Sequence, residues 1–220
     1  MEVYISKKLS DRWPQTQLGL VRYDVSVKPS DPAIRAAVEA ACKEAVPGDQ
    51  ISKLPAVHET REAYKAFGKS PSKYRNAGEA LLRQVAKKHT LPAVNAIVDL
   101  QNSVSIMTGY SIGSYDIDQL EGHVIFDIAP EPSSYQDIHG HSFNIAHLPV
   151  LYDETGPFGN PTRDSARAMI TEQSRHILTV FYVFGSEDIA DVLLGFEDLL
   201  KQYTDAEQIE LSIVDVPQAD

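Results

Sequence analysis

The segment from Leu91 to Gly122 most constrains the fold, because it joins an apolar helical pattern to a glycine-rich turn and contains no lysine or arginine. At about 3.6 residues per turn, apolar residues cover most of the expected helix: Ala93, Val94, Ile97, Val98, Leu100, Val104 and Met107. A polar stripe of Asn95, Asp99 and Asn102 runs along the opposite side. Such a helix is expected to be buried, so the stripe needs hydrogen-bonding partners in the protein or in a ligand.

The chain has 220 residues, which is enough for a hydrophobic core in one large domain or two small ones. Its one cysteine, Cys42, excludes an internal disulfide and fits a reducing compartment. The N-terminal residues lack the apolar run of a signal peptide, and no window is apolar enough to span a membrane. We therefore expect a cytoplasmic protein with no membrane partner.

The net charge of −11 is unevenly distributed. Residues 186–220 hold ten acids and one lysine, which accounts for −9, whereas residues 61–88 hold eight cations and two acids. No lysine or arginine then appears until Arg163. A basic segment beside a cation-free one can hold a polyanion next to a cationic group, and no DNA partner is expected. The alternative is a pair of solvated helix faces. The candidate anion contacts are Lys69, Lys73, Arg75, Lys87 and Lys88.

The remaining periodicity predicts one α+β domain over residues 1–220. Strands are expected at 17–27, 124–128, 167–171, 177–184 and 208–216, with short strands and loops over 135–161. Helices are expected after a Ser30 cap up to residue 46, at 57–67 and 77–88, and at 187–203 behind a Ser186 cap. No repeat or Pro/Ser-rich linker divides the chain.

Two short motifs suggest chemistry that their context does not favour. Gly109 to Gly113 matches G-x-S-x-G, but a nucleophile elbow needs a strand before its serine and a helix after it, and here the order is reversed. Two glycines around a helix end more often mark a C-cap and a turn, so Ser111 is not expected to be a nucleophile. His139 and His141, with Asp137 and His147 nearby, have H-x-H spacing, yet they lie in a polar run without a supporting ligand motif. We expect solvated loop histidines and no metal site.

Two polar clusters leave alternatives open. Thr162-Arg163-Asp164-Ser165, with Arg167 and Thr171 after it, either clamps a carboxylate or phosphate or forms a surface turn with a local ion pair. Tyr74-Arg75-Asn76 precedes a helix, so either its backbone N–H groups meet an anion or Asn76 is an N-cap.

Two long segments together resemble a known family. Residues 71–122 (PSKYRNAGEALLRQVAKKHTLPAVNAIVDLQNSVSIMTGYSIGSYDIDQLEG) and 162–184 (TRDSARAMITEQSRHILTVFYVF) are similar to the tRNA-editing domain of the bacterial phenylalanyl-tRNA synthetase β chain, and more so to proteins that consist of that domain alone. The resemblance covers about residues 17–185, leaving an acidic helix and strand at 186–216. It implies an α+β fold of layered sheets with flanking helices, a pocket for an aminoacylated tRNA 3′ end, and no aminoacylation machinery or cofactor.

The resemblance also assigns pocket positions. The family's hydroxyl and asparagine pair falls on Gln101 and Asn102, its histidine falls on Gly113, and its tyrosine-reading glutamate falls on Thr179 or Val180. Its glycine-rich turn corresponds to residues 156–160. The resulting substrate-pocket candidates are Gln101, Asn102, Ser111, Gly113, Tyr115, Gly159, Asn160 and Thr179. Because the histidine and glutamate are replaced, tyrosine specificity is not carried over.

The function expected from this resemblance is trans-acting deacylation of a mischarged aminoacyl-tRNA. Hydrolysis needs a water held ~3 Å from the ester carbonyl and donors for the developing oxyanion. Asn102 or the ribose hydroxyl of the tRNA would position that water, and backbone N–H groups near Gly113 and Gly159 would be the donors. One alternative is a binding module for an amino acid, an aminoacyl group or another small ligand, without catalysis. A second is a small ester or amide hydrolase.

Overall fold

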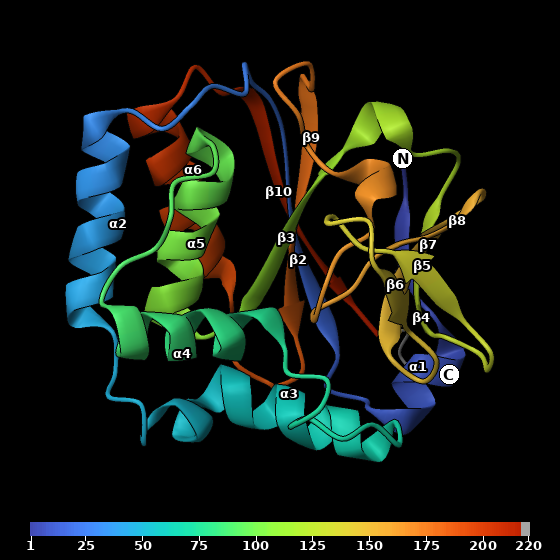
Figure 1. The fold of residues 1–220 in the computed structure, drawn as a ribbon. Helices are drawn as coiled ribbons and strands as arrows, with labels where there is room; N and C mark the ends of the chain where they lie inside the picture. The colour runs from blue at the N-terminus through green and yellow to red at the C-terminus, as the bar shows by residue number, and fades with distance from the viewer. Residues whose placement is uncertain (217–220) are drawn as a thin grey trace.

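Two four-stranded sheets form the centre of the fold in this computed structural model, which describes residues 1–216 (Figure 1). The first sheet has the order β10–β2–β9–β3, with β2 Gln17–Asp24, β3 Ser111–Asp116, β9 His176–Val183 and β10 Glu207–Asp215. The second has the order β1–β4–β7–β8, with β1 Val3–Ile5, β4 Val124–Ile128, β7 Pro149–Asp153 and β8 Gly156–Gly159. A hairpin of β5 Ser134–Gln136 and β6 Ser142–Asn144 completes the strands of this region.

Helices cover the outer side of the first sheet and one end of the molecule. α5 Ala96–Thr108 and α6 Ala190–Tyr203 lie beside the first sheet, and α2 Pro32–Glu44 packs on the outer side of α5 (Figure 1). α3 Pro55–Ala66 and α4 Ala77–Lys88 run across the end of the sheet. α1 Lys7–Arg12 packs near β4. Short 3₁₀ turns occur at Ile51–Lys53, Ile117–Gln119 and Ala166–Ala168. The α+β class and the layered arrangement expected from the sequence are confirmed.

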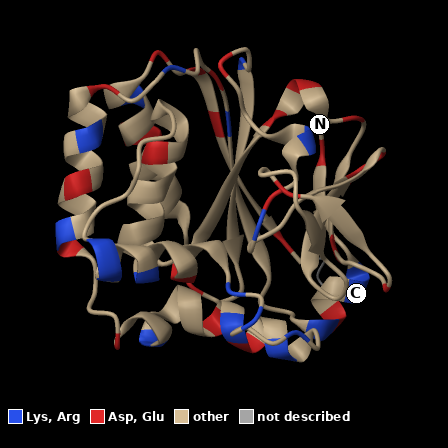
Figure 2. Ribbon diagram, in the orientation of Figure 1, with Lys and Arg blue, Asp and Glu red and all other residues tan. Residues whose placement is uncertain are grey.

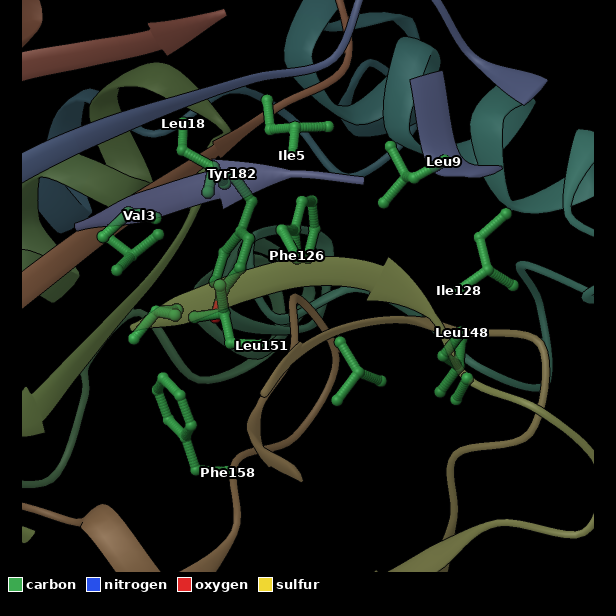
Figure 3. Close-up of a cluster of buried hydrophobic side chains, with 14 of the residues drawn as sticks. Val3, Ile5, Leu9, Leu18, Phe126, Ile128, Leu148, Leu151, Phe158 and Tyr182 are labelled. Carbon is green, nitrogen blue, oxygen red and sulfur yellow. The ribbon is translucent and has the colours of Figure 1, made fainter. Parts of the chain in front are cut away.

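The hydrophobic core lies on both faces of the first sheet. Leu18 and Tyr182 point toward the second sheet, where Tyr182 packs on Phe126 with ring centroids 5.5 Å apart (Figure 3). On the opposite face, Phe181 packs against Phe196 of α6 at 5.6 Å. Successive residues of a strand point to opposite faces, so a strand covered on both sides is apolar throughout. This accounts for the nearly unbroken apolar run in β9.

Two members of the polar stripe of α5, Asn95 and Asp99, are satisfied by the helix's own N-terminus, by α2 and by the residues before α2. α5 begins at Ala96, later than expected, because the Asn95 side chain caps it by accepting from Val98 N–H at 2.9 Å. Asp99 is buried and accepts hydrogen bonds from Arg35 at 2.8 Å and from the Ser30 hydroxyl at 2.7 Å. Contrary to expectation, Val94 and Met107 are exposed.

Three other local predictions were wrong. Asp31, and not Ser30, caps α2, since the Ser30 hydroxyl is bonded to Asp99. α6 begins at Ala190 after Ile189, so Ser186 does not cap it. Residues 167–171 do not form a strand; a 3₁₀ turn stands there because Arg167 forms a two-pronged ion pair with Asp153. The short β1 and α1 were not predicted. Among the described residues, no helix has the length and apolar character to cross a membrane.

Candidate functional site

A polar cavity lies where α4, α5, the edge strand β3 and the loop after β8 meet. Its volume is about 210 Å³, below the roughly 300–1,000 Å³ typical of sites for drug-sized ligands, so it suits a group of about amino-acid size. The lining residues are Ala77, Leu81, Gln101, Asn102, Ser105, Ser111, Ile112, Ile138, Asn160, Pro161, Thr162, Arg163, Asp164 and Tyr182.

A larger groove of about 440 Å³ lies between α2, α5 and α6, but it offers little chemistry. Apart from Glu44, its polar lining residues are Ser103 and Thr108, and both hydroxyls donate to carbonyls of α5. Alanines, Gly195 and aliphatic side chains form the rest. The polar cavity is therefore the better candidate site.

Four of the predicted pocket residues line this cavity together: Gln101, Asn102, Ser111 and Asn160. Gln101 is held in place, because its Oε1 accepts from Ser114 Oγ at 2.6 Å and its Nε2 donates to Ile112 O at 3.3 Å. Asn102 is half-buried, and within residues 1–216 its side-chain amide has no hydrogen-bond partner. The Asn102 amide is thus available to a ligand.

Ser111 and Asn160 are engaged in structural hydrogen bonds. Ser111 Oγ accepts from Gly78 N–H at 3.1 Å and donates to Asn76 Oδ1 at 3.3 Å, so it holds β3 to the start of α4. Asn160 is buried, and its Oδ1 accepts from the N–H groups of Thr162 and Arg163 at 2.7 and 3.0 Å. Ser111 follows a helix and begins a strand, so it lacks the setting of a nucleophile elbow.

The other four predicted pocket residues lie outside the lining of this cavity: Gly113, Tyr115, Gly159 and Thr179. The buried ring of Tyr115 occupies the space next to Gly113 and Gly159, so a side chain at either glycine would collide with it. Both glycines lie within strands, β3 and β8, and not in turns. A histidine at position 113 would therefore collide with Tyr115.

Thr179 belongs to a buried hydroxyl network on the helix-facing side of β9. Its hydroxyl lies 2.8 Å from Ser114 Oγ and 2.9 Å from the Tyr23 hydroxyl. Ser114 in turn donates to Gln101, which lines the cavity, so this network holds the Gln101 side chain in position. Val180, the other candidate for the family's glutamate position, lies in the core between the sheets.

Asp164 is the functional candidate that sequence reasoning missed. Its Oδ1 accepts from the Tyr115 hydroxyl at 2.6 Å and from Asn160 N–H at 3.2 Å. Burial raises the pKa of Asp164 to about 6, although both hydrogen bonds act to lower it. The Arg-Asp motif drew attention to this loop, but the expected local ion pair does not form. Arg163 instead pairs with Asp137 at 2.9 Å.

The cavity lining therefore contains both the free side-chain amide of Asn102 and the carboxylate of Asp164, whose pKa is raised. A carboxyl whose pKa lies near neutrality is suited to accept a proton from water. Arg163 is the one cation among the described lining residues, and its charge is balanced by Asp137. A ligand carrying an ammonium group would thus meet little repulsion here.

The predicted anion contacts belong to α4 and to the loop between α3 and α4, a region where Figure 2 shows several Lys and Arg positions. Lys69 and Lys73 stand over the ring of Tyr74, at 4.0 and 5.6 Å from its centroid. Arg75 precedes α4, whereas Lys87 and Lys88 occupy its last turn. Asn76 is the N-cap of α4, so the capping alternative for this motif is correct.

The histidine motif lies in the hairpin turn between β5 and β6. Asp137 accepts backbone N–H groups of His139 and His141, both at 2.9 Å. The two rings lie with centroids 6.4 Å apart. In the part of the chain that the structure describes, no group of three or more His, Cys, Asp or Glu side chains is arranged to hold a metal.

Comparison with known proteins identifies the family. Residues 59–194 match the model of the B3/4 domain, so the chain belongs to the B3/4 domain family, as its motifs indicated. No curated protein matches the sequence. Among solved structures, the fold is similar to an N-terminal fragment of the phenylalanyl-tRNA synthetase β-subunit from Pyrococcus horikoshii, with 11% identity and a TM-score of 0.45. The match covers 98% of this chain and 50% of that fragment, so the chain spans about half of its length.

Proposed function

We propose that the polar cavity hydrolyses the ester of a mischarged aminoacyl-tRNA. The observation that carries this proposal is the presence of Asn102 and Asp164 in the lining of one small cavity. The first has an uncommitted amide, and the second has a carboxyl pKa of about 6. Ester hydrolysis needs a base for water and a donor for the developing oxyanion, and these two groups fill those roles.

The proposed reaction uses water directly and no covalent enzyme intermediate. The Asp164 carboxylate accepts a proton as the water oxygen attacks the ester carbonyl carbon, and the Asn102 amide donates to the carbonyl oxygen. The carbon–oxygen bond to the ribose then breaks, and the ribose oxygen takes the proton from Asp164. This yields a free amino acid and an uncharged tRNA 3′ end, and it restores the carboxylate.

Charge and size support an aminoacyl substrate. A cavity of about 210 Å³ accepts an amino-acid side chain but not a nucleoside as well, so the tRNA would remain outside. The α-ammonium group would enter a site whose one described cation is already paired. We assign the polynucleotide contacts to the cationic edge formed by Lys69, Lys73, Arg75, Lys87 and Lys88 (Figure 2).

A deacylation panel tests the proposal. Purified protein is incubated with tRNAs carrying different mischarged amino acids, and ester loss is measured against buffer. Asn102→Ala and Asp164→Asn should each lower the rate at least about tenfold, because each removes a group that acts in the transition state. Asp198→Asn, an exposed acid of α6, is the matched control and should match wild type. Absence of turnover for every tRNA would reject the proposal.

Two further measurements separate the alternatives from the deacylase. Position 113 is a glycine, and Tyr115 leaves no room there for a larger side chain. The histidine that the family resemblance implies is therefore absent, and its absence supports a binding module without catalysis. The melting temperature of a binding module would rise in the presence of amino acids or their esters, and these ligands would not be consumed. A small-ester hydrolase would cleave tRNA-free esters at a rate independent of salt and polynucleotide.

A further inference from the structure

A second charged cluster lies between α3 and α4, away from the cavity. Glu79 is buried, and its oxygens accept from Arg61 Nη1 at 3.2 and 2.9 Å. Glu79 Oε1 also accepts from Arg83 Nε at 2.8 Å, and Arg75 Nε lies 3.5 Å from the same oxygen. Three guanidinium groups therefore gather around one carboxylate.

This cluster has an excess of positive charge. Glu79 balances one of the three arginines, and the other acid between residues 61 and 88, Glu62, pairs with Lys65 at 2.6 Å. Neighbouring like charges repel one another unless an anion lies among them. The side chains of Arg75 and Arg83 are 42% and 38% exposed, so their excess charge is accessible to a ligand.

The outer nitrogens of Arg75 and Arg83 are unused hydrogen-bond donors. In the described part of the chain, the Nη atoms of Arg75 and Arg83 donate to no acceptor. Glu79 and Arg83 are spaced four apart and share one face of α4, and Arg75, just before the helix, reaches the same Glu79 oxygen. Glu79 faces the Nε atom of each arginine, which leaves the outer guanidinium edges for two-pronged binding.

We propose that Arg75 and Arg83, oriented by Glu79, form a binding site for a phosphate group. Arg61 closes the buried side of the carboxylate and holds α3 to α4. Leu81, which lines the polar cavity, is two positions from Glu79 and thus roughly 200° around the helix. The phosphate site therefore faces away from the cavity. It shares Arg75 with the polynucleotide contacts of the proposed function, but it does not require that the cavity be catalytic. Its ligand is either a phosphodiester of RNA or a free phosphate.

Binding measurements on the whole chain test the site. Two probes are used. Binding of inorganic phosphate is followed in ¹⁵N spectra of the arginine Nε–H groups, and the second probe is a fluorescein-labelled single-stranded RNA that carries no aminoacyl ester. Phosphate should shift the signals of Arg75 and Arg83, and Arg75→Gln should weaken phosphate binding about tenfold because a charge-assisted pair is lost. Arg83→Lys should also weaken it, since the charge stays but the planar fork is lost.

A matched control separates a built site from diffuse charge. Lys43→Gln removes the same charge from an exposed position in the last turn of α2 and should leave phosphate binding unchanged. Equal weakening by Lys43→Gln, or no binding of either probe at low ionic strength, would overturn the site. Binding of RNA alone assigns the site to a polynucleotide, and binding of phosphate as well assigns it to free phosphates. Melting temperatures confirm that each variant is folded. Because neither probe contains an aminoacyl ester, a failed deacylation panel leaves this result unaffected.

Discussion

The Tyr115 hydroxyl donates a 2.6 Å hydrogen bond to Asp164 Oδ1 and thereby joins β3 of one sheet to the loop that follows the other. Tyr115 is buried, and its ring lies against Phe158 with centroids 5.0 Å apart. The tyrosine thus both supports the carboxylate and fills the space beside it. Burial raises the carboxyl pKa, and this hydrogen bond limits the rise, because it favours the charged form.

The first prediction concerns the pH dependence of deacylation. Because the pKa of Asp164 is about 6, the carboxylate that accepts the proton from water is lost as the pH falls below 6. We expect kcat/KM to fall about tenfold per pH unit below that value and to level off above pH 7. Rates between pH 5 and 8 measure this. A flat profile in the wild type would contradict the role of Asp164.

Removing the tyrosine hydroxyl should shift that profile. In Tyr115→Phe the ring remains, but Asp164 loses the hydrogen bond that stabilises its charged form. The pKa of Asp164, and with it the midpoint of the profile, should therefore move above 6. Tyr23→Phe removes a buried hydroxyl on the helix-facing side of the sheet and is the control. Equal shifts in both variants would argue against a specific effect.

The third prediction is a gain in stability with loss of activity. The pKa of Asp164 is about 6 in the folded protein against an ordinary value of 3.8, so the folded state binds more protons between these values. Its ionisation therefore lowers the free energy of unfolding as the pH rises, by up to about 3 kcal/mol at pH 7. Asp164→Asn should be more stable than wild type at pH 7, and the difference should vanish near pH 4. Urea denaturation at pH 7 and pH 4 measures the difference in unfolding free energy. A lower stability of Asp164→Asn than of wild type at both pH values would contradict the prediction.

The sequence predicted those elements whose signals are local. α4 was expected at residues 77–88 and is found there, because Asn76 caps it and the apolar spacing is regular. β4 matches at 124–128 because its alternation is complete. In contrast, residues 167–171 have strand-like composition, but Arg167 bonds to Asp153, fourteen positions earlier, and this contact favours a turn.

The candidate site was only partly accessible to sequence reasoning. Asn102 was identified from its place on the helix and from the family resemblance, and it lines the cavity. Asp164 was named only as part of the Arg-Asp motif, because its raised pKa arises from burial in the folded protein, where Tyr115, 49 positions away, donates to it. The sequence also does not show that the Tyr115 ring occupies the space a side chain at position 113 would need. Such effects require the packed structure.

The fourth prediction concerns the Arg167–Asp153 ion pair. Burial alone would raise the pKa of Asp153, but hydrogen bonds from Arg167, Glu121 N–H and Thr155 hold it at about 2, below its ordinary 3.8. This stabilisation is present above pH 3.8 and is lost as the pH falls toward 2. Arg167→Gln should lower the free energy of unfolding by about 2 kcal/mol at pH 7, with a smaller difference near pH 2. Lys7→Gln breaks an exposed pair with Asp11 and should cost less than about 0.5 kcal/mol.

The fifth prediction tests the packing of the Tyr115 ring against Gly113. A Cβ at Gly113 would lie 2.8 Å from Tyr115 Cζ and 3.1 Å from Cε2, so Gly113→Ala forces the buried ring to move. We expect a loss of about 1–3 kcal/mol in unfolding free energy. Gly195→Ala is the matched control, because its Cβ would meet nothing described within 4 Å in an exposed helix, and it should gain about 0.5–1 kcal/mol. If Gly113→Ala were neutral, Tyr115 would be free to leave its position, and position 113 would be open to a histidine.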